Sequence, residues 1–351
     1  MTPMMDHSGE RIADCSHSQS AILNPQLDDG VLLDVQDLHT YFFTAEGVGK
    51  AVNGVSFHLQ KGETLGLVGE SGCGKSITSL SILRLVPSPP GKIVSGKILF
   101  KGQNLLDYTS KQMRSVRGNQ ISLIFQEPMT ALNPVFTVGE QIAEVYRIHR
   151  RMKRRDAWNA AVEMMDKVRI PAAPQRAREY PHQLSGGMRQ RIMIAMALAC
   201  DPNLLIADEP TTALDVTIQA QILALMEELK SRFQASIILI THDLGVIAEV
   251  ADRVAVMYAG QIVEVAPVNE IFTNPLHPYT QGLLRSIPRL NQPQQAKLHV
   301  IPGMVPNPTH YPSGCRFHPR CDQRFEPCSE HDCPLHTLPD GRQVRCFLYP
   351  V

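Results

Sequence analysis

The sequence lacks an excess of charge of either sign and lacks a long apolar run. Its 34 basic and 34 acidic residues balance, whereas a dedicated nucleic-acid binder carries surplus positive charge. No stretch of about 18 uncharged apolar residues occurs, the length that a membrane-spanning helix needs. The longest candidate, residues 237–266, is interrupted by Asp243, Glu249 and Asp252, among other charges. The composition therefore predicts a protein that does not span a membrane, has no nucleic-acid partner, and reaches membranes only through partner subunits.

The N-terminus also lacks the apolar core that a signal peptide requires, so no export signal is expected. Residues 1–29 are polar and without periodicity, which is typical of a disordered tail. At 351 residues, the chain has room for one large domain or two modest ones.

An eight-residue glycine-rich segment stands between the apolar run 64–68 and the apolar segment 77–86, which has helical length. Its pattern, G-x-x-x-x-G-K-S between a strand and a helix, is that of a phosphate-binding loop. The glycines let successive backbone N–H groups face an anion, and the helix start adds its positive end. Lys75 is expected to reach the β- and γ-phosphates of a nucleoside triphosphate, and the Ser76 hydroxyl to hold Mg²⁺. The predicted binding residues are Gly69, Glu70, Ser71, Gly72, Cys73, Gly74, Lys75 and Ser76.

Patterns on either side of this loop predict further elements. Alternating strands between residues 31 and 62 indicate an antiparallel sheet beside the strand of the loop. An aromatic residue there could stack on an adenine ring or pack in a core. Residues 138–170 have helical periodicity that Pro171 and Pro174 end. The basic run within this stretch, residues 147–155, favours a solvated helix face over a membrane or nucleic-acid contact.

Later segments place polar groups at the ends of helices and strands. Ser185 and two glycines stand at a helix entrance, where a serine cap and free N–H groups form a second anion site. The apolar run 204–207 ends in Asp208, placed to hold Mg²⁺, and Glu209, which can polarise an attacking water as general base. A further strand, residues 236–240, precedes His242. Open α/β sheets bind ligands at the carboxyl ends of strands, so this histidine could contact the γ-phosphate or the water.

The sequence resembles the ATP-binding subunit of an ABC transporter. The resemblance is carried by six features in this order: the phosphate-binding loop, Gln126, LSGGMRQR (184–191), LLIADEP (204–210), residues 213–215 and His242. The resemblance covers about residues 31–270. It implies an α/β fold, a P-loop NTPase of ABC type. Such a fold has a mainly parallel core sheet, an antiparallel β subdomain and a helical subdomain at about 128–200. The ATP-binding domain would span residues 30–285, and a small cysteine-rich extension residues 286–351.

The resemblance also implies roles for residues, with ATP and Mg²⁺ held between two such subunits arranged head to tail. Lys75 and Ser76 would bind phosphate and Mg²⁺, with Asp208 supporting the metal. Glu209 would be the catalytic base and His242 the switch residue. Gln126 would sense the γ-phosphate and metal and lie near the transmembrane subunits. Phe42 would stack on adenine, with Tyr41 as the rival. The remaining implied nucleotide contacts are Asp215 and, toward the opposite subunit, Ser185, Gly186, Gly187 and Gln190.

Two segments, residues 125–134 and 277–280, resemble the dipeptide/oligopeptide permease branch. The branch comprises bacterial importers with an external solute-binding protein, two transmembrane permeases and two different ATPase subunits. The resemblance therefore implies a second, homologous ATPase partner and a position on the cytoplasmic face of the inner membrane. Its implied function is ATP-driven import of di- or oligopeptides. A soluble ABC ATPase of DNA repair or translation is the alternative. A single phosphate-binding loop and the lack of heptads disfavour it, and the intact Glu209 and His242 argue against a non-catalytic subunit.

Five of the eight cysteines fall between residue 315 and the C-terminus. A cytosolic protein rarely carries structural disulfides, and the gaps are not the close pairs of zinc fingers. Four thiolates are what an iron–sulfur cluster requires. The resemblance to the peptide branch implies a 4Fe–4S cluster on Cys315, Cys321, Cys328 and Cys346, without Cys333. Zinc and free thiols are the alternatives.

Overall fold

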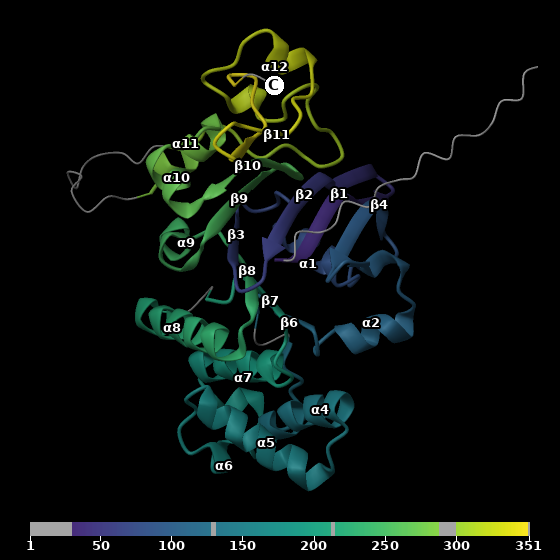
Figure 1. The fold of residues 1–351 in the computed structure, drawn as a ribbon, viewed down its shortest axis with the longest axis vertical. Coiled ribbons are helices and arrows are strands. Elements are labelled where there is room, and N and C mark those ends of the chain that lie inside the picture. The colour runs from purple at the N-terminus through teal and green to yellow at the C-terminus, as the bar shows by residue number, and fades with distance from the viewer. Residues whose placement is uncertain (1–29, 128–130, 212–214, 288–299, 350–351) are drawn as a thin grey trace, which may run out of the picture.

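The computed structural model describes residues 30–127, 131–211, 215–287 and 300–349. Two β-sheets form its centre (Figure 1). A four-stranded antiparallel sheet has the order β2-β1-β4-β5, and an eight-stranded sheet has the order β11-β12-β10-β9-β3-β8-β7-β6. The first sheet comprises β1 Val31–Thr44, β2 Gly47–Gln60, β4 Gly91–Phe100 and β5 Gln103–Asn104. The second comprises β3 Thr64–Val68, β6 Ile121–Ile124, β7 Leu204–Asp208, β8 Ser236–Thr241, β9 Arg253–Tyr258, β10 Gln261–Pro267, β11 His336–Thr337 and β12 Gln343–Val344.

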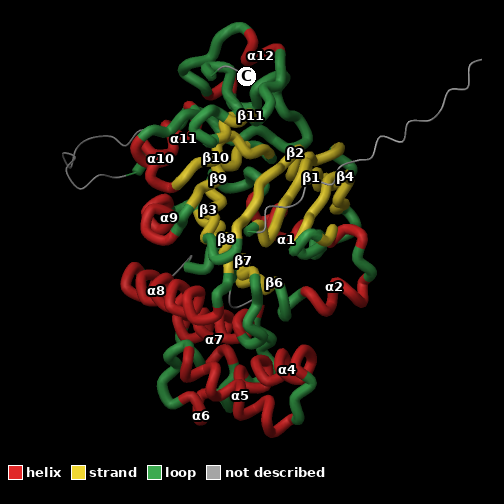
Figure 2. Tube along the Cα trace, viewed as in Figure 1, coloured by secondary structure: helices red, strands yellow, loops and turns green. Residues whose placement is uncertain are grey.

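Helices gather at one end of the molecule and irregular chain at the other, as Figure 2 shows. Helices α4 to α7 lie at the end opposite the C-terminus. The α-helices are α1 Lys75–Ile82, α2 Ser110–Val116, α4 Val138–Arg150, α5 Arg154–Lys167, α6 Ala173–Arg176, α7 Gly186–Leu198, α8 Val216–Phe233, α9 Leu244–Val250, α10 Val268–Thr273, α11 Pro278–Arg285 and α12 Pro327–Glu330. Short 3₁₀ helices span Leu105–Asp107, Pro181–Gln183 and His318–Arg320. Within the described ranges, none of the helices has the length and apolar character that a membrane crossing requires.

The central strands are parallel and buried on both faces. β3 pairs with β8 and β9, and β7 pairs with β6 and β8, all in parallel. Helix α1 packs between the two sheets. Leu65 and Ile238 therefore join the core shared with the antiparallel sheet, while Leu205 and Leu239 join the core shared with the helices. Burial on both faces explains the unbroken apolar runs of these strands. The predicted strands 64–68, 204–207 and 236–240 are confirmed.

Two helix predictions were too long. The stretch 138–170 contains two helices, because the chain turns at Arg151, which has a left-handed backbone with φ 53°. The helix after the phosphate-binding loop ends at Ile82, and Arg84 is left-handed with φ 52°. Neither turn carries the glycine that usually marks one. Arg147 donates to Glu140 at 2.6 Å, and most of the basic run is exposed, as predicted.

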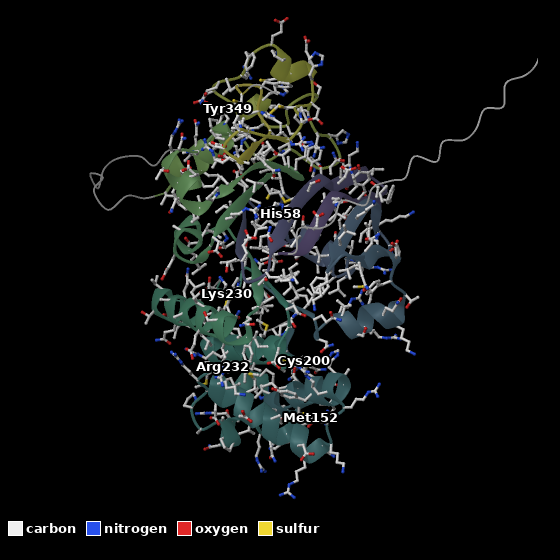
Figure 3. The ribbon with its side chains drawn as sticks, viewed as in Figure 1. His58, Met152, Cys200, Lys230, Arg232 and Tyr349 are labelled. Atoms are coloured by element: carbon white, nitrogen blue, oxygen red, sulfur yellow. The ribbon has the colours of Figure 1, made fainter. Side chains whose placement is uncertain are left out.

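The C-terminal residues extend the core sheet. β12 pairs antiparallel with β10, and β11 pairs with β12. The Tyr349 hydroxyl, labelled in Figure 3, donates to the Leu276 carbonyl oxygen at 3.0 Å. The predicted ABC-type α/β fold is confirmed, with antiparallel strands added at one edge of the parallel sheet, whereas the separate cysteine-rich C-terminal region is not confirmed. The predicted domain boundaries stay predictions, and the predicted tail, residues 1–29, lies outside the described residues.

Candidate active site

The phosphate-binding loop connects β3 to α1 and fits tightly against two neighbouring strands. Gly69 and Gly74 have positive φ angles of 151° and 103°. A Cβ atom on Gly69 would lie 2.2 Å from the Met257 carbonyl oxygen, and one on Gly74 would lie 2.3 Å from that of Ala51. Side chains at these two positions would collide with backbone, so glycine is required at both.

Lys75 lies inside the loop, with 5% of the residue exposed. Its Nζ donates to the carbonyl oxygens of Gly69 at 2.8 Å and Glu70 at 3.0 Å. The ammonium also lies 3.8 Å from the Cys73 sulfur. Burial raises the pKa of the Cys73 thiol, which the nearby Lys75 charge opposes. The ammonium is thus held inside the loop by the loop's own carbonyl oxygens, and its predicted contact with phosphate stays a prediction.

Ser76 and Asp208 meet although they are 132 residues apart. The Ser76 hydroxyl donates to Asp208 Oδ1 at 3.1 Å. Burial raises the pKa of the Asp208 carboxyl, while the Ser76 hydrogen bond and the Lys75 charge lower it. β3 and β7 both flank β8, which brings their carboxyl ends together. A hydroxyl and a carboxylate are oxygen ligands that Mg²⁺ prefers, so this pair fits the predicted ion.

Glu209 joins two other predicted residues. Its Oε2 accepts from Gln126 Nε2 at 2.8 Å, and its Oε1 lies 3.2 Å from His242 Nδ1. Glu209 has a left-handed backbone with φ 47°, and its N–H donates to the Ile240 carbonyl oxygen at 2.8 Å. Its side chain is 15% exposed, against 63% for His242. The three groups follow neighbouring parallel strands, so the structure brings them together at one sheet edge. Gln126 contacts Glu209 here, and its predicted metal contact stays a prediction.

The two candidate adenine aromatics differ in their contacts. The Tyr41 hydroxyl donates to Asn53 Oδ1 at 2.6 Å and lies 3.0 Å from His39 Nδ1. Phe42 is half-buried, and its ring edge would be 3.0 Å from a Cβ atom placed on Gly91. The Tyr41 ring is therefore held by contacts within the strand pair, and Phe42 is the better candidate for stacking on adenine. This role of Phe42 stays a prediction.

The segment at the start of α7 is only partly available to another molecule. Ser185 caps the helix, accepting from the Met188 N–H at 3.3 Å, and Ser185 and Gly186 are exposed. Gly187 is half-buried. Gln190 is 2% exposed, and its Nε2 has no hydrogen-bond partner among the described residues. The Gln190 side chain thus lies inside the subunit, and its predicted contact with the nucleotide of an opposite subunit stays a prediction.

Asp215 caps α8. Its Oδ1 accepts from the Ile218 N–H at 2.9 Å, and the residue is exposed. Residues 212–214, which carry part of the pattern quoted above, lie outside the described residues.

The predicted iron–sulfur cluster is not supported. The described cysteines are free, and no group of three or more His, Cys, Asp or Glu side chains within the described ranges is placed to hold a metal ion. Burial raises the pKa of the thiols of Cys315 and Cys321 and, to about 11, that of Cys346. Burial thus favours protonated thiols, whereas a cluster or a zinc ion needs converging thiolates. The arrangement of these residues therefore supports neither a cluster nor a zinc ion, and the Cys328 carbonyl oxygen accepts a hydrogen bond from the Cys315 N–H at 2.9 Å.

Two residues that sequence reasoning missed reach the phosphate-binding loop from the C-terminal part of the chain. The Tyr279 hydroxyl accepts from the Glu70 N–H at 2.8 Å. The Arg320 guanidinium donates to both carboxylate oxygens of Glu70, at 2.7 Å and 3.0 Å. Tyr279 lies in the segment 277–280, whose resemblance to the peptide branch could have drawn attention to it. Arg320 belongs to no recognisable sequence pattern, so the sequence gives no indication of its contact.

Comparisons with known proteins agree with this geometry. Residues 52–212 match the family model of the ABC transporter, and residues 263–328 match that of the oligopeptide/dipeptide transporter C-terminal region. The chain is 57% identical to the oligopeptide transport ATP-binding protein AppD of Bacillus subtilis, over 91% of this chain and 97% of that protein. It is 52% identical to OppD of the same organism, over 90% of this chain and 88% of that protein.

Among solved structures, the dimer of MJ0796, a bacterial ABC transporter cassette, is similar with a TM-score of 0.61 and 25% identity. The match covers 68% of this chain and 99% of that chain. The chain therefore belongs to the ATP-binding subunits of ABC transporters, in the oligopeptide/dipeptide transporter family.

Proposed function

We propose that this chain is the ATP-hydrolysing subunit that powers import of di- or oligopeptides through a membrane transporter. The observation that carries the proposal is the contact of Glu209 with both Gln126 and His242, beside the Ser76–Asp208 pair. The peptide substrate is supported by relatives whose names state oligopeptide or dipeptide transport.

In this proposal, the loop residues Gly69–Ser76 bind the triphosphate. Lys75 leaves the carbonyl oxygens of its own loop and turns to the β- and γ-phosphates. The N–H groups at the start of α1 face the same phosphates. Ser76 and Asp208 hold Mg²⁺, which when bound neutralises negative charge on the phosphate oxygens. Phe42 stacks on the adenine.

Glu209 acts as general base and takes a proton from the attacking water. Gln126 holds one oxygen of its carboxylate, at 2.8 Å, which fixes the direction of the other. His242 lies at that second oxygen and is largely exposed, so it is free to contact the γ-phosphate when a nucleotide is bound.

A second ATPase subunit completes the site. The exposed Ser185 and Gly186, with Gly187, offer N–H groups at the positive end of α7. Facing a second, homologous subunit head to tail, they contact the phosphates held by that subunit, and Asp215 lies at the same interface. The solved dimer of a related cassette supports such a pair.

The two transmembrane permeases dock beside Gln126. A largely apolar cavity of about 250 Å³ lies between β6, α4 and α7, with Leu85, Phe125 and Met193 in its wall. Phe125 is 45% exposed and directly precedes Gln126. An apolar side chain of a permease loop fits this cavity, which would couple docking to the Gln126–Glu209 contact. The subunit then works on the cytoplasmic face of the inner membrane, and an external solute-binding protein delivers the peptide to the permeases.

The test is ATP-dependent uptake of a labelled peptide into vesicles that contain the chain with its permeases and second ATPase. Peptide-loaded binding protein should stimulate ATP hydrolysis by the wild-type complex, and a Glu209→Gln complex should take up no peptide. Stimulation by DNA or ribosomes, without any effect of permeases or peptide, would instead favour the soluble ABC ATPase.

A further inference from the structure

Glu70, the second residue of the phosphate-binding loop, has its polar groups bound from two sides. Its N–H donates to the Tyr279 hydroxyl at 2.8 Å, and its carboxylate accepts two hydrogen bonds from Arg320, at 2.7 Å and 3.0 Å. Its carbonyl oxygen accepts from Lys75 Nζ at 3.0 Å. The C-terminal part of the chain is therefore joined to the phosphate-binding lysine through one residue.

Arg320 is held in place by further contacts. Its side chain is 5% exposed. Nε donates to the Pro302 carbonyl oxygen at 2.8 Å, and Nη1 lies 3.4 Å from the Tyr258 hydroxyl. A bidentate arginine–carboxylate pair has a fixed mutual orientation and is stronger than a neutral hydrogen bond. The guanidinium therefore fixes where the Glu70 side chain lies.

An aromatic cluster supports both partners of Glu70. The ring centroids of Tyr258 and Tyr279 are 4.6 Å apart, and those of Tyr258 and Phe317 are 5.2 Å apart. All three residues are at most 4% exposed. Phe317 directly precedes the 3₁₀ helix His318–Arg320. Rings packed in this way leave little freedom to the backbone that carries Arg320.

The pair also has an electrostatic consequence. Glu70 places a negative charge in the loop that is to receive a triphosphate, which carries several negative charges itself. Like charges a few ångströms apart repel strongly where water is partly excluded. Arg320, from the C-terminal part of the chain, pairs with this carboxylate at 2.7 Å and neutralises its charge.

We propose that Arg320 is a positioning residue for ATP binding, which neutralises Glu70 and thereby lets the C-terminal part of the chain set the nucleotide affinity. The inference rests on the proposed nucleotide site and deepens it. It also gives a role to the family match over residues 263–328, a stretch that contributes Tyr279 and Arg320 to the loop.

The test measures ATP affinity in the full chain, assembled with its transporter partners, for Arg320→Met, Glu70→Gln and the double variant. Arg320→Met should weaken ATP binding by about tenfold or more, because the loop that binds the phosphates then carries an unpaired carboxylate. The double variant should recover most of the affinity, since it removes that carboxylate charge. A purely structural arginine would not be rescued in this way.

Arg342→Met is the matched control. Arg342 is also a buried arginine of the C-terminal part, with its side chain 10% exposed and paired with Glu270 and Asp340. Its loss should lower the melting temperature and leave ATP affinity unchanged. Should Arg320→Met fail to fold, Arg320→Lys keeps the charge with fewer hydrogen bonds and should bind ATP with intermediate affinity.

Unchanged affinity in Arg320→Met, or in Arg320→Lys if only that variant folds, would overturn the inference. Equal losses in the Arg320 and Arg342 variants without rescue would do the same. Lys75→Ala distinguishes a failure of the Arg320 inference from a failure of the proposed nucleotide site. If Lys75→Ala binds ATP as wild type does, the nucleotide site itself is wrongly assigned.

Discussion

The imidazole Nδ1 of His242 lies 3.2 Å from Glu209 Oε1, and these groups come from the ends of two neighbouring parallel strands. Gln126 binds the other oxygen of the same carboxylate. A carboxylate held at both oxygens has a defined direction before any nucleotide binds. This arrangement fits a base that must meet one water molecule in one geometry.

Replacing Glu209 with glutamine should leave ATP binding intact and slow hydrolysis by about 10²–10⁴-fold, because the amide cannot accept the proton of the attacking water. ATP turnover by the assembled transporter is the measurement. Glu228→Gln is the control, since Glu228 is exposed on α8 and pairs with Arg169. Wild-type turnover in Glu209→Gln would remove Glu209 from the base role.

Lys75→Ala should bind ATP much more weakly, because the phosphates lose the ammonium that the loop holds at Gly69 and Glu70. A loss of about tenfold or more is expected for a charge-assisted contact of this kind. Isothermal titration of ATP is the measurement, with Lys101→Ala, in the turn that follows β4, as the control. Equal affinities for Lys75→Ala and wild type would refute the assignment.

Ser76→Ala should raise the Mg²⁺ concentration needed for half-maximal hydrolysis, by about tenfold or more, since one metal ligand is lost. The pKa of Asp208 should rise further at the same time, because the Ser76 hydrogen bond opposes the effect of burial. Activity should then fall off at a higher pH on the acid side than in wild type. A Mg²⁺ dependence identical to that of the exposed control Ser115→Ala would count against the metal role.

Acid should destabilise the fold through His277. This side chain is buried, and burial lowers its pKa to about 3, while its Nδ1 accepts from the Tyr279 N–H at 3.0 Å. The unfolded chain takes up a proton near the ordinary histidine pKa of about 6.5. Stability from the neutral imidazole is therefore complete above that pH and is lost as the pH falls toward 3.

His277→Asn keeps an acceptor at the helix cap and removes the titration. Urea unfolding of this variant should show a smaller fall in the free energy of unfolding between pH 7 and pH 5 than wild type. His310→Asn, in an exposed turn, is the control and should behave as wild type does. A fall of the same size in His277→Asn would place the acid sensitivity elsewhere.

The sequence predicts the nucleotide site well where a polar candidate residue directly follows a buried strand. Strands buried on both faces leave unbroken apolar runs, and the polar residues that follow them, such as Asp208 and His242, are then brought to one sheet edge by parallel pairing. The helix breaks at Arg84 and Arg151 were not predictable, because both residues adopt a left-handed backbone without glycine. Tertiary packing decides such positions.

Contacts between residues far apart in the chain are even harder to predict from the sequence. Glu70 and Arg320 are 250 residues apart, and a single ion pair imposes no period on the sequence. The burial of Gln190 was hidden for a related reason: the pattern indicates where α7 begins, whereas neighbouring helices decide which side chains turn inward.

The pairing of β12 with β10 has a consequence for truncated forms of the chain. β10 has β9 on one side and β12 on the other, through Glu264–Val344 and Val265–Gln343. A chain cut before Gln343 would leave one side of β10 with unpaired backbone groups over a largely apolar strand. Such an open edge is a template for strands of other molecules, so the shortened protein should aggregate. Residues 343 and 344 are thus expected to protect the folded subunit from aggregation.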